Sequence, residues 1–154
     1  MKARKGGFTL VELLIVIMII AILAGMMLLA TGTATDSAEA TKVINDLRNL
    51  KSAALLYYGD NMRWPGTADA ASLDRYSDRP FTGTNGRYDA VTVGTGYIVD
   101  GITRINIGLG LKGNSATKGV QDKLASKAAE TGLLQGADVS TIYTGGTEIF
   151  MNMR

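Results

Sequence analysis

A continuous apolar run occupies the first part of the chain and limits what the chain can fold into. From Phe8 to Ala30 the only polar side chains are Thr9 and Glu12. A run of that length can cross a bilayer as a helix, which needs about 20 apolar residues. Three cations precede it: Lys2, Arg4 and Lys5. The positive-inside rule places these cations in the cytoplasm and the rest of the chain on the outer side.

The carboxylate of Glu12 lies inside this run and needs a partner. An ionisable side chain in a membrane span costs roughly 2.5–3.5 kcal/mol, and no Lys or Arg occurs between Leu13 and Thr35. Either Glu12 lies at the level of the headgroups, or a cation reaches it by another route. Cleavage between Gly7 and Phe8 would supply one, because it frees the α-amino group of Phe8 one helical turn away. In a stack of identical helices, Glu12 of one copy could then pair with the Phe8 amine of its neighbour.

The segment Gly7-Phe8-Thr9-Leu10-Val11-Glu12, followed by an aliphatic helix, resembles the N-terminal signature of type IV pilins and pseudopilins. The resemblance covers Met1 to about Tyr58. It implies that a prepilin peptidase cleaves after Gly7 and that the new N-terminal residue, Phe8, is N-methylated. It further implies that Glu12 and Thr9 take part in docking into a helical filament. One departure is that many members carry a proline within the apolar helix, whereas the first proline here is Pro65.

This resemblance implies a structural subunit, not an enzyme, that forms the homopolymer of a type IV pilus-like filament. Its partners would be further copies of itself, the bacterial inner membrane, the prepilin peptidase and the pilus or secretion assembly machinery. Before assembly the chain would lie in the inner membrane, and afterwards in an extracellular pilus. The alternative is a pseudopilin or minor pilin of a type II secretion or DNA-uptake system, which as a pseudopilin would stay in the periplasm.

Three alternative interpretations lie outside the family. An ordinary secretory signal would be cleaved after the apolar core, for which Gly32-Thr33-Ala34 offers a site. A simple membrane anchor would have no role in assembly. A signal-anchored enzyme or binding protein would need a pocket in residues 60–154 with converging ionisable groups.

The composition excludes the most common kinds of catalytic site. The 154 residues contain no His and no Cys, which removes the usual zinc sites, His-dependent nucleophiles and disulfides. We expect no catalytic residue, no cofactor and no metal. Loss of residues 1–7 would remove 3 of the 16 cations and none of the 14 acids, so the net charge becomes 13 − 14 = −1. That balance argues against a nucleic-acid partner.

Two sequence patterns resemble ligand sites. Residues 108–113 satisfy G-x-G-x-x-G, but the strand before them belongs to an antiparallel hairpin, which favours a strand end and loop over a dinucleotide site. Some pseudopilins bind calcium, and a calcium loop could be drawn from four loop residues: Asp60, Asn61, Asp69 and Asp74. Their spacing matches no EF-hand loop, which favours solvated carboxylates.

We expect one long helix over residues 8–58, with residues 8–30 as the membrane span and filament core and residues 36–58 amphipathic. Helical spacing places five residues of the second part on one stripe: Val43, Leu47, Leu50, Ala54 and Tyr57. Asp36-Ser-Ala-Glu39 has capping-box character, which predicts a break or kink there. Gly59 is the expected stop.

The remaining residues predict a head of about four antiparallel strands laid on the helix, so the fold class is α+β and pilin-like. Residues 59–87 are expected to form a solvated connection with one helical turn near 68–76, and the head to cover 88–154. Strands at 88–99 and 102–111 should pair around Asp100-Gly101, with Ile98 opposite Thr103 and Gly94 opposite Ile107. A short helix is expected at 118–130, and a second hairpin at 141–144 and 147–153 around Gly145-Gly146.

Overall fold

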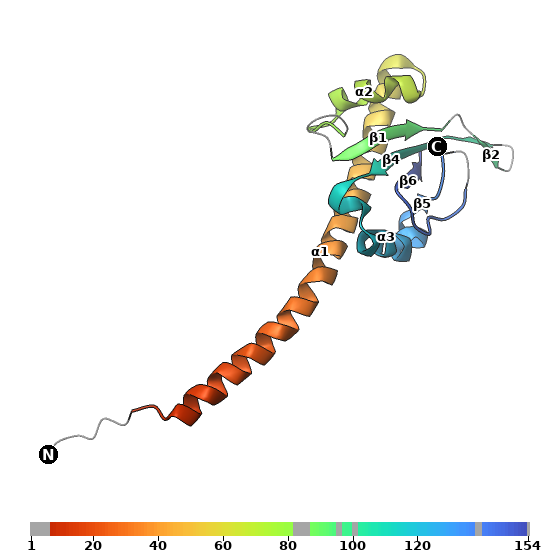
Figure 1. Ribbon diagram of the computed structural model, residues 1–154. Helices are drawn as coiled ribbons and strands as arrows, with labels where there is room; N and C mark the ends of the chain where they lie inside the picture. Colours follow the sequence, from red (N-terminus) through yellow and green to blue (C-terminus); the bar gives the residue numbers. More distant parts are fainter. Residues whose placement is uncertain (1–6, 82–86, 95–96, 100–101, 138–139, 154) are drawn as a thin grey trace. The chain divides into compact units, whose positions relative to one another are not determined.

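The computed structural model describes residues 7–81, 87–94, 97–99, 102–137 and 140–153. It divides into two units, residues 1–35 and 36–154. Helix α1 (Leu10–Asn61) runs through 52 residues without the predicted break at Asp36–Glu39 (Figure 1). The hydroxyl of Thr41, which follows this stretch, bonds within the helix, since it donates to the carbonyl of Ser37 at 2.8 Å.

Helix α1 ends at Asn61, two residues after the predicted stop at Gly59. The backbone N–H of Met62 donates to the carbonyl of Tyr58 at 2.8 Å, and Met62 has a φ of 53° in the left-handed region. Glycine usually occupies such a position because it has no Cβ. Here a methionine occupies the left-handed position. The prediction from glycine therefore set the end of the helix too early.

The second part of α1 carries the core of the head. All five residues of the predicted stripe are buried, with exposed fractions from 0% at Val43 to 4% at Tyr57. They belong to one hydrophobic cluster together with Ile107 and Leu109 from the sheet. The amphipathic stripe and its burial are therefore confirmed.

The sheet has four strands in the order β1-β4-β6-β5. Strand β1 (Tyr88–Val93) pairs antiparallel with β4 (Asn106–Leu111), β4 with β6 (Glu148–Asn152), and β6 with β5 (Leu133–Leu134). Strands β2 (Tyr97–Val99) and β3 (Ile102–Arg104) form a separate two-stranded ribbon. The expected α+β fold, a long helix packed against a four-stranded antiparallel sheet, is confirmed.

The pairing within the first hairpin is correct only near its tip. Ile98 lies opposite Thr103 as predicted, but Val93, not Gly94, lies opposite Ile107. The register changes by one residue between the ribbon and the main sheet, which strict alternation cannot anticipate. Gly96 and the Asp100-Gly101 turn lie outside the described residues.

The second predicted hairpin is wrong. Residues 141–143 pair with β5 rather than with β6: the N–H of Tyr143 donates to the Leu133 carbonyl at 3.0 Å, and that of Gln135 to the Thr141 carbonyl at 2.8 Å. Strand β6 is occupied on both edges by β4 and β5. No edge of β6 is left for residues 141–144, a consequence of distant pairing that local sequence does not reveal.

The connection after α1 contains 3-10 turns at Thr67–Asp69 and Asp74–Tyr76 around helix α2 (Ala70–Leu73). It is not simply solvated, because Leu73 and Phe81 are buried in the core cluster. Helix α3 (Lys118–Thr131) buries Val120, Leu124 and Ala128 and ends at Gly132, whose φ is 71°. The predicted buried side and stop of this helix are confirmed.

Candidate functional site

The start of helix α1 is organised by two side chains that bond to each other. The backbone N–H and the hydroxyl of Thr9 both donate to Oε2 of Glu12 at 2.8 Å. In return, the N–H of Glu12 donates to the hydroxyl oxygen of Thr9 at 3.2 Å. This reciprocal arrangement is a capping box, with Thr9 preceding the helix and Glu12 in its first turn.

The sequence carries the signal for this cap, since Thr9-Leu10-Val11-Glu12 has the form Ser/Thr-x-x-Glu. The same pattern at Asp36–Glu39 forms no cap, since α1 runs through it. The structure therefore adds an intramolecular role: Glu12 satisfies orphan donors at the helix N-terminus, where the dipole also favours a carboxylate. Its second oxygen, Oε1, has no hydrogen-bond partner within the described residues.

The bond expected to be cleaved is open to the surroundings. Gly7, Phe8 and Glu12 are all exposed, Phe8 to 88%. A Cβ placed on Gly7 would meet no atom within 4 Å. Packing within the chain therefore does not require glycine at this position, and any requirement for it must come from a molecule that binds here.

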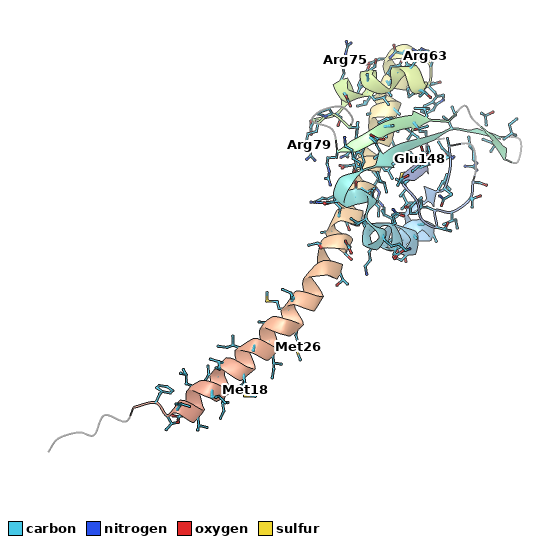
Figure 2. The ribbon with its side chains drawn as sticks, in the orientation of Figure 1. Met18, Met26, Arg63, Arg75, Arg79 and Glu148 are labelled. Carbon is cyan, nitrogen blue, oxygen red and sulfur yellow. The ribbon has the colours of Figure 1, made fainter. Side chains whose placement is uncertain are left out.

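The apolar segment that follows is exposed in every direction. Four consecutive residues, which together go once around the helix, have exposed fractions of 47% to 57%: Val16, Ile17, Met18 and Ile19. Figure 2 shows Met18 and Met26 standing out from the helix. The best 18-residue window has a mean hydropathy of 3.1, which makes α1 long and apolar enough to cross a membrane. A helix apolar on all sides needs lipid or protein around it.

In the head, a groove of about 310 Å³ lies between α1 and residues 76–81. Two of the charged residues that line it, Asp46 and Arg87, belong to one network. Arg87 bonds to Glu39 and approaches Asp46 at 3.7 Å, and the hydroxyl of Tyr88 donates to Asp46 at 2.7 Å. Burial, together with this bond, raises the pKa of Tyr88 above its usual range. The network fastens β1 to the helix and leaves no carboxylate dyad poised for acid–base chemistry in the described part of the groove.

The two patterns that resembled ligand sites have structural explanations. Gly108 and Gly110 lie inside strand β4, so residues 108–113 form no phosphate loop. The loop carboxylates serve separate partners: Asp60 accepts from the Tyr76 hydroxyl at 2.8 Å, Asp69 from Arg63 at 2.7 and 2.9 Å, and Asp74 from the Phe81 N–H at 3.0 Å. Within the described residues, no group of three carboxylates could hold a metal ion.

Comparison with known proteins points to the same end of the chain. Residues 2–28 match the family described as the prokaryotic N-terminal methylation motif. Fimbrial protein EcpC of Eikenella corrodens is 32% identical over 123 residues, which cover 80% of this chain and 73% of that protein. No solved structure matches the chain.

Two further relatives differ in how much of the chain they cover. The fimbrial protein of Neisseria meningitidis serogroup B is 32% identical over 114 residues, 73% of this chain and 64% of the relative. Type II secretion system core protein G of Aeromonas hydrophila is 34% identical over 79 residues, 51% of this chain and 54% of the relative. The chain thus spans less than two thirds of the length of these two relatives.

Proposed function

Because the chain belongs to the family of type IV pilins and pseudopilins, we propose that it is the structural subunit of a type IV pilus-like filament. Members of this family are structural proteins rather than enzymes. The observation that carries the proposal is the apolar segment of α1, which is exposed on all sides and begins with an exposed Gly7-Phe8 junction and a capped Glu12. Such a segment suits the membrane before assembly and a bundle of identical helices afterwards.

Processing prepares the end of the helix for assembly. A prepilin peptidase cleaves after Gly7, Phe8 becomes the N-methylated N-terminus, and its amine becomes a cation near Glu12. Because the cap uses Oε2 of Glu12, Oε1 stays available to the Phe8 amine of a neighbouring copy. This ion pair sets register, since a buried pair contributes little net stability. Cohesion comes from burying apolar helix surface, at about 25 cal/mol per Å² removed from water.

The extent of similarity favours a pilin over a pseudopilin. The two fimbrial relatives align with 73% and 80% of the chain, and so reach into the head. The secretion-system relatives align with 42% to 51% of it. A pseudopilin or minor pilin of a type II secretion or DNA-uptake system is the second candidate, supported by the 38% identity to core protein G of Klebsiella pneumoniae over 64 residues.

Location and partners follow from the same segment. Lys2, Arg4 and Lys5 keep the leader in the cytoplasm while the apolar helix lies in the inner membrane. The assembly machinery then withdraws the chain into an extracellular filament, or into a periplasmic one for a pseudopilin. The filament is a polymer of this chain.

Electron microscopy of material sheared from producing cells tests the proposal, together with N-terminal sequencing and intact mass of its main component. We expect filaments built of a chain that begins at N-methylated Phe8. Filaments confined to the cell envelope would favour the pseudopilin. A chain that begins at Met1 or Thr35 and stays monomeric in solution would contradict both candidates.

A further inference from the structure

The groove between α1 and residues 76–81 has the size and the fixed walls of a ligand site. Its volume is about 310 Å³, and it lies wholly within the unit of residues 36–154. Ligand pockets in proteins begin at about 300 Å³, so the groove has room for one small molecule. The Tyr88 hydroxyl donates to Asp46 at 2.7 Å, which holds that carboxylate in place at the groove.

The aromatic side chains that line the groove are also held in place. The Tyr76 hydroxyl donates to Asp60 at 2.8 Å, and the Tyr76 ring lies edge-to-face with Tyr57, with 6.2 Å between ring centroids. The N–H of Phe81 donates to Asp74 at 3.0 Å, and the Phe81 side chain is buried. These contacts exist without a ligand. Binding would therefore not have to order this wall, which favours affinity.

Three exposed side chains at the groove have no partner. The side chains of Asn49, Asp78 and Arg79 line the groove and take part in no hydrogen bond or ion pair within the described residues. A guanidinium group only donates hydrogen bonds, a carboxylate only accepts them, and an amide does both. The groove therefore offers a ligand both unused donors and unused acceptors.

The charges that line the groove cancel, and this narrows the class of ligand. Asp46 and Asp78 contribute two negative charges, and Arg79 and Arg87 contribute two positive ones. A phosphate would meet two carboxylates, and a polyamine would meet two guanidinium groups. An apolar ligand would take unpaired polar groups out of water, which is costly. A neutral molecule rich in hydroxyls avoids all three penalties, because each hydroxyl both donates and accepts.

We propose that the groove binds a neutral saccharide. The sugar hydroxyls accept from Arg79 and Asn49 and donate to Asp78, and the C–H face of the sugar ring packs against the half-buried ring of Tyr76. An amino acid zwitterion would engage Asp78 and Arg79 but leave the Asn49 amide unmatched. The inference goes beyond the proposed function and does not rest on it, because the groove belongs to the head alone.

NMR titration of the full chain, solubilised in a detergent without a sugar headgroup, tests the site. The probes are glucose, galactose, mannose and N-acetylglucosamine, with glycine and inorganic phosphate as controls. We expect at least one sugar to shift the amide signals of residues 46–52 and 76–81, with a Kd of about 1–10 mM. No such shift from any of the four at about 100 mM, or binding of glycine or phosphate that is at least as tight, would overturn the proposal. Neither result depends on filaments, so the proposed function is tested separately.

Substitutions of unpaired side chains show whether the sugar binds in the groove. Arg79→Leu and Asn49→Ala each remove a donor at an exposed position, so the chain should stay folded while the affinity falls at least about fivefold. The matched control is Arg75→Leu, which should leave the affinity unchanged. Arg75 is also exposed and in no ion pair within the described residues, but it does not line the groove, and Figure 2 shows it apart from Arg79. Unchanged affinity in either groove variant, or an equal loss in Arg75→Leu, would overturn the site.

Discussion

Glu12 combines a role inside the chain with a proposed role between chains, and two substitutions separate them. Glu12→Gln keeps an acceptor for the Thr9 donors, since glutamine also serves in capping boxes, but it removes the charge. Glu12→Ala removes both and should weaken the start of the helix. We expect both variants to be inserted and processed yet to form at least tenfold fewer filaments, counted by electron microscopy. Normal filaments from Glu12→Gln would show that capping alone is the function of this residue.

The fold does not require glycine at position 7, so any need for glycine there comes from a binding partner. Because a Cβ there meets no atom of the chain within 4 Å, Gly7→Leu should leave the structure unchanged but obstruct a peptidase that must approach the Gly7-Phe8 bond closely. We expect the leader to remain attached and the protein to accumulate in the membrane, with an intact mass that includes residues 1–7. Processing of Gly7→Leu at the normal rate would contradict cleavage at this bond.

At position 108, by contrast, packing within the fold itself requires glycine. A Cβ there would lie 2.3 Å from Cδ1 of Phe150 and 2.7 Å from the carbonyl oxygen of Ile149. Because backbone blocks one side, Gly108→Ala should lower the free energy of unfolding by about 1–3 kcal/mol. Gly59→Ala is the control: its Cβ would meet nothing within 4 Å, and alanine favours the helix by up to about 1 kcal/mol. Thermal unfolding of the detergent-solubilised chain measures both variants. A Gly108→Ala variant at least as stable as Gly59→Ala would contradict this packing.

At the scale of elements, both edges of the sheet are covered. The outer edge of β1 is met by the connection after α1, where the N–H of Tyr88 donates to the Phe81 carbonyl at 3.0 Å and the Thr67 hydroxyl to the Val93 carbonyl at 3.2 Å. Residues 141–143 cover β5 in the same way. Uncovered edges allow sheets of different molecules to join. These contacts at the two sheet edges favour the helix as the surface for the proposed polymerisation.

The segment that covers β5 provides a pH-dependent test. Burial, aided by the negative charge of Asp122, raises the pKa of Tyr143 to about 12, and its hydroxyl donates to the Gly146 carbonyl at 2.7 Å. A pKa raised on folding means that stability is complete below the unfolded value of about 10 and is lost as pH rises toward 12. We expect the unfolding temperature to fall over that interval, and less steeply in Tyr143→Phe. Because the pKa of Tyr88 is also raised, some fall should remain, and identical slopes would contradict the assignment.

Elements defined by local pattern could be predicted from the sequence, and those defined by distant pairing could not. The buried stripe of α1 and the buried side of α3 follow from helical spacing, and both were predicted correctly. Strand β5 has two residues and exists only because β6 and the segment 141–143 flank it, so no local pattern marks it. The cap of Glu12 is different, because its signal, Thr9-x-x-Glu12, is local and present in the sequence.

At the scale of the whole molecule, the residues that stabilise the fold and those proposed for assembly occupy different parts of the chain. Every residue of the hydrophobic core cluster lies between Ala40 and Met153. The residues of the proposed processing and of the proposed Phe8–Glu12 pair, by contrast, lie between Gly7 and Glu12. Contacts also divide the chain between Thr35 and Asp36. Folding of the head should therefore not depend on the apolar segment.

A chain that begins at Asp36 tests this division. Removal of residues 1–35 deletes the exposed apolar segment and leaves the core cluster and its Glu39–Arg87–Asp46 network whole. We expect this variant to be soluble without detergent, monomeric in size-exclusion chromatography and cooperative in thermal unfolding, yet unable to enter filaments. Because the new N-terminus lies within α1, the first turn of the shortened helix should fray, which hydrogen exchange at residues 36–39 would report. An aggregated or unfolded product would mean that the head needs the N-terminal segment to fold, and the separation of stability from assembly would then fail.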